Sequence, residues 1–280
     1  MKPPTPLDRA ALDAHPLPPV IDGDKETKGR LLVIAGSPSV PGAALLAATA
    51  AMRAGAGKLR IATSETIAAA IGIAMPEAMV VGLPGGAAAV KMAAEQAAEV
   101  DAVIAGPGMD NGEDCATMCE ALLGSKVQLA LDAAMLRSLE PQAKARHPAP
   151  ILLPHAKELA ALLDCDEQEI EREPIGCGLR AAQSFHSLVL VKGVTSHVVT
   201  PDGQAWAYEG GAPGLGVSGS GDALAGIVGG LLARGAQPLS ALMWAVWLHG
   251  EAGARLAKKI GPIGFLAREI AAEIPSLLPR

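Results

Sequence analysis

Residues 31–63 have the sequence LLVIAGSPSVPGAALLAATAAMRAGAGKLRIAT, and this stretch decides the fold class. The apolar run at 31–35 predicts a buried strand. A helix is predicted from Gly42, with an end at Gly55 and Gly57, and KLRIAT at 58–63 predicts the next strand. A strand, a helix and a second strand in this order indicate parallel strands joined by a crossover.

The same alternation continues outward from this stretch. Further strands are predicted in 101–108 (DAVIAGPG), 127–136 (VQLALDAAML), 150–163 (PILLPHAKELAALL, where a turn and a helix follow) and 187–193 (SLVLVKG). Residues 196–211 predict a hairpin that turns at Asp202-Gly203, and the chain after Gly221 has helical patterns almost to its end. No internal repeat or shift in composition divides it. We therefore predict one α/β domain over residues 29–280, preceded by a proline-rich, irregular arm (1–28) on the surface or on a neighbouring subunit.

The composition excludes several classes of protein. A net charge of -6 and 2% aromatic residues argue against a nucleic-acid partner, and the four cysteines of this 280-residue chain form no disulfide framework. The N-terminus has prolines and charges where a signal peptide has an apolar core. The most apolar long region, 66–90, is interrupted by Pro76, Glu77 and Pro84 and is not expected to span a membrane. We expect a cytoplasmic protein.

The strongest candidate site is at 215–226, LGVSGSGDALAG. Apolar residues recur at helical spacing after Asp222, which places Asp222 in or near the first turn of a helix. The free amides of Gly219, Ser220 and Gly221 would then form an anion site suited to phosphate. The alternative is that Asp222 only caps the helix.

A second candidate lies where the strand at 187–191 ends. Lysine, glycine and two hydroxyl side chains in residues 192–196 (KGVTS) suit the phosphates or ribose of a nucleotide, although an ordinary turn has the same composition.

Taken together, the motifs resemble one family. They occur in the order found in ADP/ATP-dependent NAD(P)H-hydrate dehydratases, from about Lys28 to the C-terminus. This family belongs to the ribokinase-like superfamily. The resemblance therefore implies an α/β fold, a ribokinase-like α/β/α sandwich with a mostly parallel central sheet flanked by helices. The segments that carry it are KGRLLVIAGS, GAALLAATAAMRAGAGKLRIAT, PEAMV, DAVIAGPG, LALDA, LLPHAKELAALL, LVLVKGVTS, PDGQAW, PGLGVSGSGDALAGIVGGLLARG and WLHGEAGARLA.

The resemblance implies a lyase of metabolite repair whose substrate is hydrated NADH or NADPH. Such an enzyme phosphorylates the added ring hydroxyl with ADP or ATP as co-substrate and Mg²⁺ as cofactor, and loss of phosphate restores the double bond. It further implies a small-molecule substrate and a homo-oligomer, the tetramer being common in the family. Many members carry a fused epimerase domain, which we do not expect in this chain.

The resemblance also implies roles for individual residues. Asp222 would be the base, with Gly219, Ser220 and Gly221 holding the transferred phosphoryl group. No metal ligand is assigned. The nucleotide would contact Lys192, Gly193, Val194, Thr195, Ser196 and Gly221, and the hydrated dinucleotide would contact Ala43, Gly108, His155 and Asp222.

Departures from the family pattern keep other functions open. Val40-Pro41 stands where a tyrosine is usual, Ala134 where a second aspartate is usual, Lys157 where a glycine is usual and Ala212 where an asparagine is usual. The alternatives are a small-molecule kinase of the same superfamily and a catalytically weakened nucleotide-binding homologue.

Six further residues keep two interpretations each. Asp132 supports a metal or is an ordinary loop acid. Glu158 helps to hold water or magnesium or is an exposed acid in the first turn of a helix, and His155 contacts substrate or caps a helix. For His249 we favour a hydrogen-bonded core or interface residue, and for Trp244 and Trp247 we favour packing.

Overall fold

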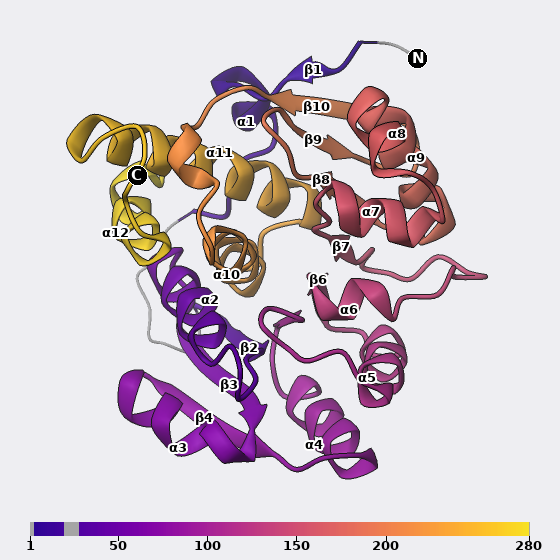
Figure 1. The fold of residues 1–280 in the computed structure, drawn as a ribbon, viewed down its shortest axis with the longest axis vertical. Coiled ribbons are helices and arrows are strands. Elements are labelled where there is room, and N and C mark those ends of the chain that lie inside the picture. The colour runs from indigo at the N-terminus through magenta and orange to yellow at the C-terminus, as the bar shows by residue number, and fades with distance from the viewer. Residues whose placement is uncertain (1–2, 20–27, 280) are drawn as a thin grey trace.

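The computed structural model describes residues 3–19 and 28–279. A ten-stranded sheet lies between two layers of helices, as Figure 1 shows. From one edge to the other, the strands are β1 (Thr5–Pro6), β10 (Ala205–Tyr208), β9 (Ser196–Val199), β8 (Leu188–Val191), β7 (Ile151–Leu152), β6 (Gln128–Leu131), β5 (Ala102–Ala105), β2 (Arg30–Ile34), β3 (Lys58–Ser64) and β4 (Ala78–Leu83).

The strands from β4 to β8 are parallel, as the alternating pattern predicts. β2 lies between β3 and β5, with Leu31 opposite Leu59 on one side and Ala102 on the other. β9 runs antiparallel to both β8 and β10. The hairpin predicted at Asp202-Gly203 is confirmed, and Gly203 has φ +88°, which favours glycine at this turn.

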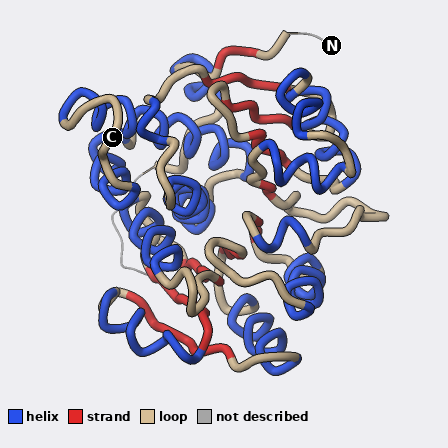
Figure 2. The backbone as a smooth tube through the Cα atoms, viewed as in Figure 1, coloured by secondary structure: helices blue, strands red, loops and turns tan. Residues whose placement is uncertain are grey.

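Helices cover both faces of the sheet, as Figure 2 shows. Alternate β2 side chains enter different cores: Leu31 and Val33 belong to one, Leu32 and Ile34 to the other. The first core contains residues of α1 (Arg9–Ala14), α2 (Gly42–Arg53), α3 (Glu65–Ala74), α10 (Ser220–Ala233), α11 (Pro238–Lys259) and α12 (Ala267–Leu277). The second contains residues of α4 (Ala87–Ala97), α5 (Glu113–Leu123), α6 (Ala134–Arg137), α7 (Ala156–Leu163), α8 (Glu167–Arg172) and α9 (Pro174–Ser184).

The abundance of glycine and alanine is explained by the contact between α2 and α10. A Cβ atom on Gly226 would lie 2.2 Å from the carbonyl oxygen of Ala47, and one on Gly230 would lie 2.4 Å from that of Ala51. The two backbones approach so closely that only glycine fits on α10. This contact fixes the axis of α10, whose N-terminus carries the Gly-Ser-Gly-Asp motif.

The N-terminal segment differs from the predicted irregular arm. Residues 5–6 form a strand beside β10, and Arg9–Ala14 form a helix. Leu12 is fully buried in the same chain, and Trp244 Nε1 donates to the carbonyl oxygen of His15 over 3.0 Å. Irregularity was therefore the wrong prediction for these residues, because apolar burial orders them. The part of the predicted arm at 20–27 lies outside the described residues.

The region 66–90 contains α3 and the edge strand β4. In the described part of the chain, no helix combines the length and apolarity needed to cross a bilayer. A cytoplasmic location stays a prediction.

Candidate active site

The N-terminus of α10 has the geometry of an anion site. Gly219 takes the N-cap position with φ +87°, and a Cβ atom there would lie 2.4 Å from Leu46 Cδ1. Glycine therefore lets the loop turn tightly against α2. Asp222 is the third residue of the helix and not its cap, so the capping alternative is wrong.

The Asp222 carboxylate is in an environment that favours its neutral form. Its pKa is raised to about 6. Burial is the largest cause, the nearby charge of Asp132 also raises the pKa, and the positive charge of Lys192 lowers it. No described residue forms a hydrogen bond with this carboxylate. A carboxylate with these properties can accept a proton near neutral pH.

Lys192 connects the sheet to this helix. It follows β8, and its Nζ lies 2.9 Å from Asp132 Oδ1 and 3.9 Å from Glu158 Oε2. It also lies 3.7 Å from the position that a Cβ atom on Gly221 would occupy. Asp132 and Glu158 are both buried, so the interpretation of Glu158 as an exposed acid is wrong.

His155 is held beside Lys192 by the extension of β7. The two residues form an isolated parallel bridge, and Lys192 N donates to the Pro154 carbonyl oxygen over 2.9 Å. His155 is the N-cap of α7: Glu158 N donates to His155 Nδ1, while His155 N donates to Glu158 Oε2 over 2.9 Å. The capping interpretation of His155 is confirmed, and its imidazole stays half exposed.

His249 contacts the anion loop from α11. Its Nε2 lies 2.9 Å from Ser220 Oγ and 3.2 Å from the Ser220 carbonyl oxygen. Burial, with a smaller contribution from Lys192, lowers its pKa to about 4, although the backbone hydrogen bond at Ser220 acts in the opposite direction. The imidazole is therefore neutral at neutral pH.

A cavity of about 770 Å³ lies beside these groups, and the side chains of Asp132, Glu158 and Asp222 are not part of its lining. Its walls include His155, Lys192, Gly193, Val194 and Ser196 from the sheet side, and Ser220, Gly221 and His249 from the helices. Of the predicted nucleotide residues, only Thr195 is not part of this lining.

The predicted substrate residues divide into two groups. His155 lines the cavity, whereas Ala43 and Gly108 lie together at the start of α2. Gly108 has φ +62°, and a Cβ atom on it would lie 2.4 Å from Ala43 Cβ. The structure thus places Gly108, in the loop after β5, against Ala43 in the first turn of α2, the helix whose Leu46 lies beside Gly219.

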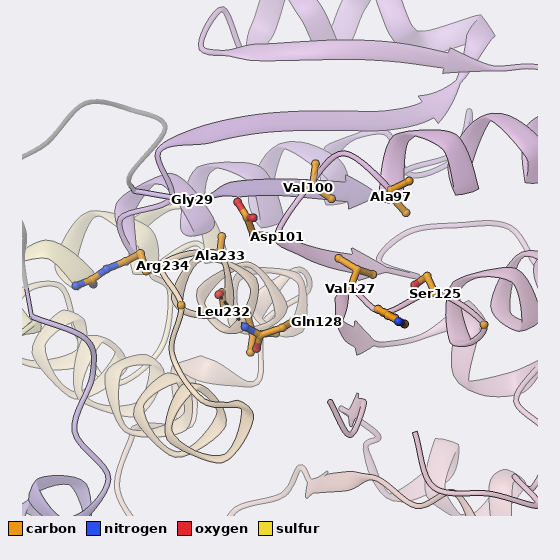
Figure 3. Close-up of a pocket in the computed structure, with 14 residues that line it drawn as sticks. Gly29, Ala97, Val100, Asp101, Ser125, Val127, Gln128, Leu232, Ala233 and Arg234 are labelled. Atoms are coloured by element: carbon orange, nitrogen blue, oxygen red, sulfur yellow. Dashed lines mark hydrogen bonds between the residues drawn. The ribbon is translucent and has the colours of Figure 1, made fainter. Parts of the chain in front are cut away.

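A larger hollow of about 910 Å³ lies at the opposite end of the strands. Figure 3 shows Asp101 and Gln128 beside the C-terminal end of α10, with Arg234 at the rim. In parallel sheets, ligands bind at the carboxyl ends of the strands, and none of the predicted site residues lines this hollow.

Comparison with known proteins shows which family has this fold and the Gly-Ser-Gly-Asp loop at the start of α10. Residues 31–276 match the family described as NAD(P)H-hydrate dehydratase. The chain belongs to the NAD(P)H-hydrate dehydratase family. The ADP-dependent (S)-NAD(P)H-hydrate dehydratase of Xanthomonas campestris is 45% identical over 278 residues, which cover 97% of this chain and 95% of that protein.

Solved structures in this family have the same fold. The ADP/ATP-dependent NAD(P)H-hydrate dehydratase of Bacillus subtilis, co-crystallised with ATP and Mg²⁺, superposes with a TM-score of 0.88 at 28% identity, over 98% of this chain and 97% of that one. A ribokinase-like protein of Enterococcus faecalis has a TM-score of 0.84 at 23% identity, over 98% and 94% of the two chains. The ribokinase-like fold expected from the sequence is confirmed.

Carboxylates near Lys192 are the side chains that could hold a magnesium ion in this site. Among residues 3–19 and 28–279, no cluster of three or more His, Cys, Asp or Glu side chains could hold a metal alone. Asp132 and Glu158 nevertheless both lie within 4 Å of the single ammonium group of Lys192, and Asp222 is close enough to be affected by the charges of Asp132 and Lys192. Mg²⁺ is commonly held by one or two carboxylates together with phosphates and waters, and this donor set fits such a site.

The sequence did not reveal two members of the site. His249 and Tyr208 both line the cavity, and Tyr208 Oη donates to Glu251 Oε1 over 3.0 Å. The available signal was weak: His249 and Glu251 are polar side chains in an otherwise apolar helical segment.

Proposed function

We propose that this chain dehydrates hydrated NADH and NADPH in metabolite repair, with ADP or ATP as the phosphoryl donor. The observation that carries the proposal is Asp222. Its pKa is raised to about 6, and it lies in the first turn of α10 beside Lys192. The amides of Gly219 and Gly221 have no backbone acceptor there among the described residues, whereas Ser220 N donates to the Val217 carbonyl oxygen over 3.2 Å.

Asp222 is assigned the role of general base. It accepts the proton of the ring hydroxyl while the hydroxyl oxygen bonds to the terminal phosphorus of the nucleotide, and the bond from that phosphorus to the leaving nucleotide breaks. The amides of Gly219 and Gly221 neutralise the charge on the phosphoryl oxygens, while the Ser220 amide, which was also predicted to do so, already donates to Val217 O. Loss of phosphate, together with a ring proton, then restores the double bond.

The nucleotide is assigned to the cavity of about 770 Å³. Lys192 and Gly221 lie at the end where the phosphates meet Asp222. Gly193, Val194, Thr195 and Ser196 follow as the wall along the rest of the nucleotide. Ala43, Gly108 and His155 are assigned to the hydrated dinucleotide, as the resemblance implies.

Magnesium fits this arrangement as a partner of the nucleotide. Asp132 and Glu158 would hold it through one or two carboxylate oxygens and water, and it would neutralise phosphate charge. Because Asp132 already pairs with Lys192, the ion and the ammonium group share the same carboxylates.

The chain is proposed to associate with copies of itself. Ile73 on α3 and Met79 on the edge strand β4 are 84% and 55% exposed, and β4 contains no charged residue. An apolar, uncharged sheet edge is a typical site of association. Sedimentation equilibrium tests this proposal, and a monomer at all concentrations would contradict it.

The decisive experiment mixes hydrated NADH with the protein, Mg²⁺, and either ADP or ATP. Return of the dihydronicotinamide absorbance is expected with at least one nucleotide, and Asp222→Asn should lose it. A phosphorylated product without elimination would indicate a small-molecule kinase instead. Nucleotide binding without any turnover would indicate a weakened homologue.

A further inference from the structure

Ser220, at the start of α10, is buried and at the same time lines the cavity. It is the first residue of α10, between Gly219 and Gly221, and it lines the cavity although its side chain is largely buried, with 5% of the residue exposed. Ser220 therefore lies beside the place where the proposed function puts the phosphates.

The contact with His249 determines the direction of the Ser220 hydroxyl. His249 Nε2 lies 3.2 Å from the Ser220 carbonyl oxygen, which can only accept a hydrogen bond. The hydrogen must then be on Nε2. Nε2 also lies 2.9 Å from Ser220 Oγ, so this oxygen accepts a hydrogen bond from the same N–H group.

The hydrogen of the Ser220 hydroxyl is left for another acceptor. No described residue other than His249 forms a hydrogen bond with Ser220 Oγ. The neutral form of His249, with its lowered pKa of about 4, has only one ring hydrogen and keeps it on Nε2. The hydroxyl hydrogen is consequently available to the cavity.

We infer that the Ser220 hydroxyl donates a hydrogen bond to the transferred phosphoryl group, and that His249 is a positioning residue that aligns this hydroxyl from α11. This inference rests on the proposed function for the identity of the phosphoryl group. It adds a side-chain donor to the backbone amides of Gly219 and Gly221. It also gives α11 a role in the reaction, through a residue that does not itself need to touch the phosphate.

The kinetic test compares variants of these two residues. Ser220→Ala should lower kcat about 10- to 100-fold, in line with loss of one preorganised donor, with little change in the KM for nucleotide. His249→Leu should have a similar effect. His249→Gln should restore most of the activity, since its amide N–H can donate to Ser220. The double variant Ser220→Ala/His249→Leu should be no worse than Ser220→Ala alone, because His249 acts through Ser220.

A matched control separates this role from a packing role. Ser187 is a fully buried serine at the start of β8 whose hydroxyl has no partner among the described residues, so Ser187→Ala should leave kcat unchanged. Thermal unfolding of every variant identifies any that fail to fold. Additive losses in the double variant, or a Ser220→Ala enzyme with the kcat of the unmodified protein, would overturn the inference.

A binding measurement makes the result independent of the substrate. Calorimetry with Mg²⁺, orthovanadate and the leaving nucleotide, which is AMP if ADP is the donor and ADP if ATP is the donor, uses vanadate as a mimic of the phosphoryl group in transfer. Ser220→Ala should weaken this binding at least 10-fold and leave binding of the leaving nucleotide alone unchanged. If hydrated NADH is not converted but this difference is present, the proposed function fails and the role of Ser220 stands. Equal binding by the two proteins, or no binding by the unmodified protein, would overturn the role of Ser220.

Discussion

At the scale of single residues, Asp222 is subject to opposite requirements. Folding places its carboxylate where burial and Asp132 disfavour ionisation, yet a general base must be ionised to accept a proton. A pKa of about 6 means that the base is largely ionised at neutral pH and still basic enough to accept a proton. With Asp222 as the proposed base, the electrostatic environment of this one residue would set the lower end of the pH range of activity.

The first prediction is a pH profile. The kcat/KM of the unmodified protein should fall below about pH 6 with a slope of one, since a single carboxylate becomes protonated. Asp132→Asn should move this fall in kcat/KM to lower pH, because the substitution removes a charge that raises the pKa of Asp222. Initial rates from pH 4.5 to 8.5 test both. If kcat/KM of Asp132→Asn falls at the same pH as in the unmodified protein, Asp222 is not the group whose protonation lowers the rate.

The second prediction concerns stability. The folded-state pKa of Asp222, about 6, is above its ordinary value of 3.8, so the folded protein binds more protons between these values. The free energy of unfolding therefore falls as pH rises through this window. Asp222→Asn should be more stable than the unmodified protein at pH 7.5, by on the order of 1–3 kcal/mol, and similar to it near pH 4.

Urea unfolding at the two pH values measures this difference, and turnover of the same variant should fall by about 10²- to 10⁴-fold. Greater stability together with lost turnover would show that Asp222 is retained for function. A variant that is less stable at pH 7.5 would instead assign Asp222 a structural role.

At the scale of elements, the position of α10 depends on residues without side chains. Gly226 and Gly230 allow α2 to approach to backbone contact, and α10 in turn carries Gly219, Ser220 and Asp222. The helix pattern of 224–232 could be predicted from its apolar spacing. The closeness of the two helices could not, because a glycine in a helix indicates nothing about the helix that packs against it.

The third prediction tests this contact. Gly226→Ala should lower the free energy of unfolding by about 1–3 kcal/mol, since its Cβ atom would lie 2.2 Å from Ala47 O and α10 must shift. Binding of ADP should weaken along with stability, because the anion loop moves with the helix. Gly85→Ala is the matched control, as nothing lies within 4 Å of the added Cβ atom. Equal unfolding midpoints in the two variants would contradict the prediction.

Elements that differ from expectation have identifiable physical causes. β4 was not predicted as a strand, because its segment AMVVGL lacks a clear alternation of apolar and polar residues and is only partly buried at the sheet edge. Glu158 could be placed in the first turn of α7. Its burial beside Lys192 could not be predicted, since β6, β7 and β8 must first be placed side by side.

At the scale of the whole molecule, the parallel sheet and its two helical layers could be predicted from the alternation of strands and helices. The order of the strands could not: nothing local in the sequence places β5 between β2 and β6, or Thr5–Pro6 beside β10. The meeting of Asp132, Lys192 and Asp222 depends on that order. The motifs therefore selected His155, Lys192 and Gly221, which line one cavity, and the fold supplies their distances; the assignment of the site stays a prediction.

The N-terminal segment offers a test at this largest scale. Leu12 is fully buried in the first core, Arg9 stacks 5.1 Å from the ring of Trp244, and Trp244 donates to His15 O. These contacts are all within one chain. The segment is therefore expected to stabilise a single protomer, in contrast to an arm that exchanges between subunits.

Leu12→Ala should accordingly lower the free energy of unfolding by about 2–5 kcal/mol, the cost of a cavity left by a buried leucine. The loss should be the same at all protein concentrations, because no partner chain supplies the contact. Ile263→Ala, at a residue that is 70% exposed, is the matched control and should change stability by less than about 0.5 kcal/mol. Urea unfolding followed by tryptophan fluorescence at two concentrations a hundredfold apart measures both. A destabilisation that grows as the protein is diluted would instead place the Leu12 contact between subunits.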